Sequence, residues 1–504
     1  MIGEGDEMEP ELKFEELSGF DILARETQTH EETMEASLPD YCASVSRVID
    51  TAGQVLVQEI SPGEGRLRGE VRVSVLYVSE EAEGLQSATV AVPFVCELVE
   101  KRLRECRLLQ VYSRLLLCEG KIVTGRKLYV RVIGEFTVRG IGAVSWRICT
   151  NAEGAGLQLR WQQAEIAVLK GAIQRECSIH QEFTPDGMTE APEEILTERL
   201  YPRVISSQQI GNKLVVKGEI RLCGMVRQQD RKLGRMDMTL PFSQILDGTV
   251  FPEGGKIWVR ACVAQWELRL LRSEGSCSLT ARLTLQAFCT EKQSLRWVSD
   301  LYSTEETLTV SDRNMSISQL EAPVFHEAAA EETLEFGSKT PFVYLTGCDC
   351  GVPVCREDGA AATPVRLRLL YIDEEGAPAT VERSREVVAP VEEKPSFLWA
   401  ENGPAELQSG AGRYSLRLPV WMQAAYMKPS DVCSVVSVQA EKETEERRRP
   451  SLVLRRPKHG ESLWDIAKAY RSSEEAIRKL NHMEGEELPE GMMLIPAVHT
   501  AARQ

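Results

Sequence analysis

The chain has 504 residues, of which 43% are hydrophobic and 27% charged, and its formal net charge is −17. At roughly 150 residues per domain this length predicts three or four domains, and the acidic balance disfavours nucleic acid or an anionic membrane as the main partner, because both are bound through clustered positive charge. No run of the sequence approaches the ~18 apolar residues of a membrane span, so we expect no transmembrane segment.

Residues 1–34 form an acidic segment that lacks the basic start and the apolar middle of a secretory signal. We therefore expect the protein to act in the cytoplasm in which it is made. The fourteen cysteines fit such a compartment, because many of them stand inside apolar runs and read as small, reduced core residues.

A strand-like pattern then recurs three times along the chain. The copies align on Arg72, Arg221 and Arg366, which lie 149 and 145 residues apart. A Pro-Phe pair follows each of the first two copies, whereas the third copy has only Pro390. Self-similarity at a fixed spacing is typical of repeated structural units. The copies read GEVRVSVLYV at 69–78, GEIRLCGMVR at 218–227 and VRLRLLYI at 365–372, and the Pro-Phe pairs stand at 93–94 and 241–242.

These units are predicted to be β-rich. Apolar and polar residues alternate within the copies, which places one set of side chains toward a core and the other set outward. We therefore expect each unit to be an antiparallel sheet or sandwich, with a hairpin turn at Gly211-Asn212 and short helices at 183–200 and 312–322. The predicted boundaries are 35–176 for the first unit, 177–322 for the second and 323–440 for the diverged third.

The third unit contains the stretch GCDCGVPVC, which places Cys348, Cys350 and Cys355 within eight residues. Three thiols at this spacing are a weak candidate for a zinc site. No fourth ligand stands at a usual spacing, and the nearest upstream histidine is His326, so the alternative is a glycine-rich loop with free thiols. We expect no metal and no cofactor.

A charged linker at 441–451 precedes a compact tail at 452–497, which is predicted to run strand, helix, helix, strand. Ser462 stands where the first helix would be capped, with Asp465 three residues later as a loose capping box. Ser472 or Ser473 would cap the second helix.

This tail resembles a LysM domain. The resemblance rests on the run GESLW at 460–464 before the first helix, on the end of the second helix, and on LPEG at 488–491 before the last strand. It implies a shallow groove between two loops that holds N-acetylglucosamine polymers, with Leu463 and Met483 as candidates for apolar contact with the sugar ring. Carried over by position, the first loop is Gly460, Glu461, Ser462 and Leu463, and the second is Asn481, His482, Met483 and Glu484.

Three basic residues, Arg455, Arg456 and Lys458, stand beside the first loop. They could steer an acidic partner toward the groove. They could equally be solvated charges that block pairing at a strand edge. Both interpretations stay open at this point.

The larger part of the chain resembles the SPOCS-domain proteins of spore-forming Firmicutes, in which several β-rich domains precede one C-terminal LysM domain. The resemblance rests on LPDYCASVSRVI at 38–49 and on the strand RGEVRVSVLYV with its Pro-Phe pair, together with the recurrence of that strand. It implies a mainly β chain of three SPOCS-like units, built as antiparallel sheets or sandwiches, and a small βααβ LysM domain. It also implies a role in spore coat morphogenesis, in the mother-cell cytoplasm at the forespore surface. The implied partners of the LysM domain are stage IV sporulation protein A, a coat-basement ATPase, and other coat proteins.

Motifs for catalysis are absent from the sequence. The stretch GEGRLRG at 63–69 is one residue too long for a dinucleotide loop, and PEGGKIWV at 252–259 lacks the Ser or Thr that would hold magnesium. We therefore expect no enzyme. Two hypotheses remain: a coat scaffold whose LysM domain docks a protein, because a chain without an export signal does not meet peptidoglycan, and a peptidoglycan- or N-acetylglucosamine-polymer-binding protein of the cell wall or cortex.

Overall fold

The computed structural model describes residues 10–185, 191–271, 275–335, 342–391, 393–410, 413–441, 450–485 and 487–497. Up to residue 441 the described chain is antiparallel β-structure with one short 3-10 helix, η1 (Lys101–Glu105), which confirms the prediction of a mainly β fold. No helix in these ranges is long and apolar enough to cross a membrane. Most of the predicted linker at 441–451 lies outside the described residues.

A six-stranded antiparallel sheet runs through most of the molecule, in the order β11-β12-β7-β1-β6-β5. Four of its strands have 27 or 28 residues, against a usual five or six, and at about 3.3 Å per residue they span roughly 90 Å. The strands are β1 (Glu11–Ser37), β5 (Leu108–Thr124), β6 (Lys127–Glu153), β7 (Leu157–Phe183), β11 (Lys256–Leu271) and β12 (Ser276–Ser303).

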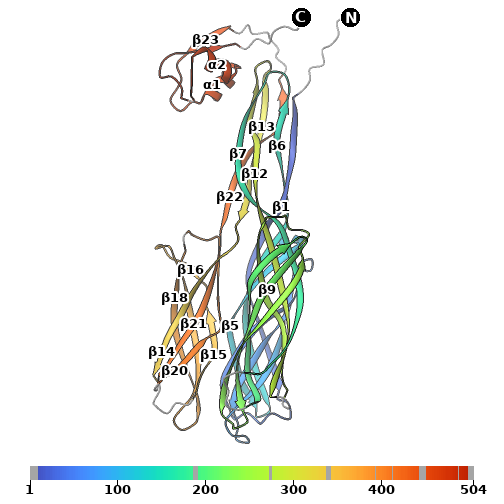
Figure 1. Cartoon of the computed structure of the whole chain (residues 1–504), viewed down its shortest axis with the longest axis vertical. Helices are drawn as coiled ribbons and strands as arrows, with labels where there is room; N and C mark the ends of the chain where they lie inside the picture. The colour runs from blue at the N-terminus through green and yellow to red at the C-terminus, as the bar shows by residue number, and fades with distance from the viewer. Residues whose placement is uncertain are drawn as a thin grey trace.

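These long strands divide the molecule into a body and a stalk (Figure 1). β1 and β7 pair through Phe20 and Leu169, which joins the two halves of the sheet at a narrow neck. On one side of the neck the strands enclose the cores of the body. On the other side the ends of β1, β6, β7 and β12 pack against a two-stranded ribbon, β13 (Leu308–Leu320) with β22 (Met427–Ala440), through smaller apolar clusters. We call this second part the stalk.

The acidic N-terminal segment is part of this framework from Glu11 onward. β1 lies inside the sheet, between β7 and β6, and it pairs with β6 along nearly its whole length. Its acidic residues alternate with less exposed ones, and some of them form ion pairs with basic residues diagonally across the ladder, as Glu31 does with Arg131 at 2.7 Å. The sequence alone predicts a separate acidic segment, because the residues of β6 that pair with these acids lie about 100 residues further along the chain.

Three hydrophobic cores fill the body. The first lies between β1, β5 and β6 and a three-stranded sheet, and the second repeats that arrangement with β7, β11 and β12. The third lies between two smaller sheets. The added strands of the first unit are β2 (Arg47–Ser61), β3 (Arg66–Val78) and β4 (Leu85–Glu97), and those of the second are β8 (Pro192–Ile210), β9 (Lys213–Gln228) and β10 (Leu233–Asp247). The third contains β14 (Val324–Glu335), β15 (Val343–Cys350), β16 (Val354–Cys355), β17 (Ala360–Ile372), β18 (Pro378–Pro390), β19 (Phe397–Asn402), β20 (Glu406–Gly410) and β21 (Arg413–Ala425).

The repeated sequence pattern corresponds to the central strand of three sheets, β3, β9 and β17. In the first unit Gly69 lies opposite Phe94, and a Cβ on Gly69 would come within 2.0 Å of the Leu56 carbonyl oxygen and 2.8 Å of the Phe94 ring. The second unit repeats this pair as Gly218 and Phe242. The ring therefore occupies the space that the glycine leaves open.

The third unit replaces both members of this pair. At the corresponding place on β17 stands Thr363, and Val387 lies opposite it. Pro390 lies opposite Ala360, so it does not occupy the position of the earlier prolines and its sequence alignment with them is wrong. The Gly and the Phe are therefore replaced together. The Thr363 side chain occupies the space over the strand that the Phe ring fills in the first two units, so a ring would no longer fit there.

The predicted turn at Gly211-Asn212 is confirmed, since Ile210 pairs with Lys213 across it and Gly211 has a φ of 57°. The predicted helices at 183–200 and 312–322 are wrong. The described part of the first belongs largely to β7 and β8, and most of the second belongs to β13. Pairing of these strands with β12, β9 and β22 outweighs the weak local helix preference that suggested them.

Candidate binding groove of the C-terminal domain

The described part of the C-terminal region, residues 450–485 and 487–497, folds as strand, helix, helix, strand, as predicted. The two strands pair antiparallel, and the hydrophobic residues Ile466, Ala467 and Ile477 are fully buried between them and the helices. The elements are β23 (Leu452–Arg455), α1 (Leu463–Tyr470), α2 (Glu474–Leu480) and β24 (Met493–Pro496).

Local capping fixes the start of both helices. Ser462 accepts a hydrogen bond from the Asp465 amide, and Asp465 accepts one from the Ser462 amide, so the predicted capping box is present. Ser473, one of the two residues predicted for this role, caps α2. The hydrogen bonds from Ser462 hold the pKa of Asp465 below its usual value.

The first predicted loop is ordered by Glu461. Its carboxylate accepts a hydrogen bond from the Lys458 amide at 2.7 Å and forms an ion pair with Arg455. The bond from Lys458 is the main cause that lowers the pKa of Glu461. Gly460 sits in the turn with a φ of 84°, a conformation that favours glycine.

The second predicted loop is largely structural. The Asn481 amide donates to the carbonyls of Ile477 and Leu494 and accepts from the Leu494 amide, so it ties the end of α2 to β24. Met483 packs against the core of the domain. His482 and Glu484 are exposed, and His482 has a positive φ of 51°.

A groove with a volume of about 970 Å³ lies beside the first loop. Its lining includes all four residues predicted there, together with Arg456 and Lys458, whereas the Arg455 guanidinium stacks over the ring of Tyr470. None of the four predicted second-loop residues lines it. The groove is instead lined by residues that follow the second loop in the sequence, namely Leu488, Pro489 and Glu490.

The opposite wall of the groove comes from the stalk, which the sequence did not indicate. Leu159, Arg160 and Trp161 of β7 line the groove together with the loops of the C-terminal domain. The groove is therefore composite, because residues about 300 positions apart in the sequence form it.

Asp300 and Tyr302 of β12 hold the C-terminal domain on the stalk, and we call their contacts with that domain the latch. Asp300 of β12 accepts hydrogen bonds from Trp464 Nε1 at 2.7 Å and from Lys468 Nζ at 2.7 Å. Tyr302, two residues further, packs its ring 4.9 Å from that of Trp464 and donates its hydroxyl to the Ser472 carbonyl. Burial raises the pKa of Tyr302, which keeps this hydroxyl protonated. Trp464 therefore helps to position the domain, and only 6% of its surface is exposed.

The cysteine-rich stretch of the third unit lies far from this groove, on β15 and β16. Cys348 and Cys350 lie on β15 and contact each other, and this contact together with burial raises the pKa of Cys348. Cys355 lies on β16. Across the described ranges, no three Cys, His, Asp or Glu side chains come together in a way that could hold a metal ion.

Comparison with known proteins identifies the C-terminal domain. Residues 458–495 match the LysM domain family. No curated protein and no solved structure matches the chain. A LysM domain indicates binding of peptidoglycan or a related polysaccharide, and the matched residues include the first loop and most of the groove lining. The chain therefore carries a C-terminal LysM domain, which is joined to a long antiparallel β-structure.

Proposed function

We propose that this protein is a non-enzymatic scaffold that docks a partner in the groove of its LysM domain. The observation that carries this proposal is the position of the domain. The LysM domain lies at the end of the stalk, far from the three cores of the body, and Asp300 and Tyr302 fix it there (Figure 1). A recognition domain that is held in one orientation at the end of long strands is suited to connecting its own partner with a second partner bound by the body.

The charges of the groove favour a protein as the partner. Arg160, Lys458 and Arg478 line it together with Glu461, Glu474 and Glu490, so both signs are present. A neutral polysaccharide would cover these charges without pairing them, which costs free energy. A polypeptide with charged side chains of both signs can pair them and gains specificity from doing so.

The resemblance of the repeated units to SPOCS-domain proteins, and of the whole chain to the spore coat morphogenetic protein SipL, extends this proposal. We infer a scaffold of the spore coat, which acts at the forespore surface in the mother-cell cytoplasm. Its LysM domain would dock an ATPase like stage IV sporulation protein A. The recurrence of Gly69 and Phe94 as Gly218 and Phe242 supports related units, because the same packing pair recurs at the same place.

A polysaccharide ligand is the second candidate. The match to LysM favours it directly, and the composite groove is large enough for a sugar oligomer. Trp161 in the groove wall offers an aromatic ring for contact with a sugar. In this case the protein would bind peptidoglycan or another polymer of N-acetylglucosamine in the cell wall or cortex.

The engagement of Glu461, one of the groove carboxylates, supports a non-enzymatic role. Glu461 is held ionised by Lys458 and Arg455, so it is a poor general acid and its oxygens are already engaged.

Interferometry on the immobilised full chain tests the proposal. The two analytes are the stage IV sporulation protein A of the same organism and soluble N-acetylglucosamine oligomers. We expect micromolar or tighter binding of the ATPase, weakened about fivefold or more by Lys458→Glu in the groove. Lys479→Glu, a change at another exposed lysine that lies on α2 outside the groove, should leave binding unchanged. Binding of the oligomers alone would establish the polysaccharide function instead, and binding of neither would refute both.

A further inference from the structure

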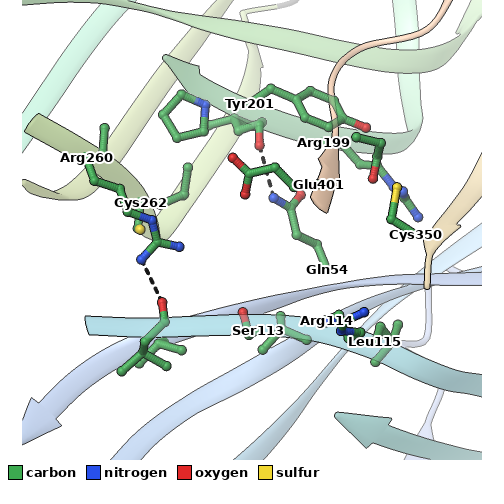
Figure 2. Close-up of a pocket in the computed structure, with 18 of the residues that line it drawn as sticks. Gln54, Ser113, Arg114, Leu115, Arg199, Tyr201, Arg260, Cys262, Cys350 and Glu401 are labelled. Carbon is green, nitrogen blue, oxygen red and sulfur yellow. Dashed lines mark hydrogen bonds between the residues drawn. The ribbon is translucent and has the colours of Figure 1, made fainter. Parts of the chain in front are cut away.

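A second cavity lies in the body, where the three units meet, and we propose that it binds a small oxyanion such as a carboxylate or phosphate compound. Its volume is about 240 Å³, and each of the three units contributes to its lining. Figure 2 shows Glu401 and Gln54 in its middle, with Arg260 on one side and Arg199 on the other. This site is independent of the LysM groove.

Three arginines supply the positive charge of the cavity. Arg114 comes from β5, Arg199 from β8 and Arg260 from β11, so they converge from two units. Arg260 donates to the Val111 carbonyl at 2.7 Å, and Arg199 makes a long contact of 3.4 Å to the Gly53 carbonyl. Within the described ranges neither forms an ion pair with a carboxylate, whereas Arg114 lies 2.8 Å from Glu135. The cavity thus holds guanidinium groups whose charge is not neutralised by contact.

Two acidic side chains of the cavity offset part of this charge. Glu401 and Asp349 both line it. Desolvation by the surrounding protein raises the pKa of each carboxyl. Glu401 has accessible surface, and in Figure 2 that side chain projects into the cavity, so the cavity is open to solvent there.

Several buried polar atoms in the lining have no partner within the described protein. Arg114 Nη1 and Trp421 Nε1 are unused donors, and the amide oxygens of Gln54 and Gln286 are unused acceptors. A buried polar atom that is left unpaired is unfavourable, because it has lost its hydrogen bonds to water. A ligand with an acidic group and a hydroxyl group would satisfy donors and acceptors together.

The size of the cavity limits the ligand. At about 30 Å³ for each water it holds roughly eight waters, or one small organic acid or phosphate compound. Guanidinium groups bind both carboxylates and phosphates through paired hydrogen bonds. The competing explanation is purely structural, since Arg260 stacks on Tyr112 at 4.1 Å and Arg114 on Trp399 at 4.3 Å.

Calorimetric titration of the full chain with inorganic phosphate and with citrate, at constant ionic strength, separates these explanations. We expect saturable binding of at least one anion. Glu401→Gln should tighten it about tenfold, because this change removes a negative charge from the cavity. Arg199→Gln should weaken it about tenfold or more, and Glu253→Gln, an exposed carboxyl of a turn away from the cavity, should leave it unchanged.

Two results would overturn the proposal. One is the absence of saturable heat with either anion up to millimolar concentration. The other is an affinity that Glu401→Gln leaves unchanged or weakens, because binding would then occur elsewhere. If Arg199→Gln fails to fold, as judged by circular dichroism, the Glu401→Gln result still decides, since Gln has nearly the size of Glu and lacks its negative charge. Phosphate binding without citrate binding would assign the site to phosphate compounds, and the reverse would assign it to organic acids.

Discussion

Replacement of Asp300 by Ala should loosen the LysM domain from the stalk and destabilise its first helix. Asp300 accepts hydrogen bonds from Trp464 Nε1 and from Lys468 Nζ, both at 2.7 Å. A hydrogen bond to a charged group contributes about 1.5–3 kcal/mol, and the partly exposed ion pair with Lys468 adds at most about 1 kcal/mol. Tyr302 retains its packing and its bond to Ser472, so we expect a loss of about 2–3 kcal/mol rather than complete release.

Native-state hydrogen exchange measures this loss at the amides of α1. A loss of 2–3 kcal/mol should lower their protection about 30- to 140-fold, because each 1.4 kcal/mol is tenfold. Lys468→Ala removes only the ion pair and should lower protection by less than about fivefold. Amides of β9 in the body should not change in either variant. Unchanged protection of α1 in Asp300→Ala would refute the latch as a source of stability.

Three further changes test the packing of the body and the electrostatics of the groove. Gly69→Ala should destabilise the first unit by about 2 kcal/mol or more in urea unfolding. Gly63→Ala is the control and should be nearly neutral, because a Cβ at that position meets nothing within 4 Å. Equal effects of the two changes would contradict the packing argument. Arg368 forms an ion pair with Asp50 at 3.0 Å across the junction of the third and first units. Arg368→Ala should lower the free energy of unfolding by about 3–5 kcal/mol, because it leaves the buried Asp50 without its positive partner. A loss below about 1 kcal/mol would show that the junction does not depend on this pair. Since the folded pKa of Glu461 lies below its usual value of 4.5, its carboxylate stabilises the LysM domain at neutral pH and this contribution is lost as the pH falls through the folded pKa. The melting temperature of the domain should therefore drop below about pH 4.5, and Glu461→Gln should flatten that drop; an equally steep drop in the variant would exclude Glu461 as the cause.

The LysM domain could be predicted in detail because its signals are local. The cap at Ser462 and its partner Asp465 are three residues apart, and all elements lie within one short stretch. The loop positions were harder to predict, since Asn481 has the sequence position of a ligand-binding residue but is fully used in joining α2 to β24. Only the structure distinguishes these two roles.

The arrangement of the long strands could not be predicted, because it depends on distant partners. Asp300 and Trp464 are 164 residues apart, and neither carries a motif that points to the other. The cavity of the body likewise combines Arg114, Arg260 and Glu401 from separate units. The repeat at Gly69 and Gly218 is visible in the sequence. The structure adds the reason for these glycines, which is that a Phe ring of the neighbouring strand lies over each of them.

The central claim is that the composite groove at the end of the stalk is where this protein binds its partner. Hydrogen exchange of the full chain, with and without a saturating amount of the analyte that binds in interferometry, tests it most directly. We predict slower exchange at 458–463, at 488–490 and at 159–161, three segments that line the groove. Slower exchange confined to the strands of the body, with no change at these segments, would contradict the claim.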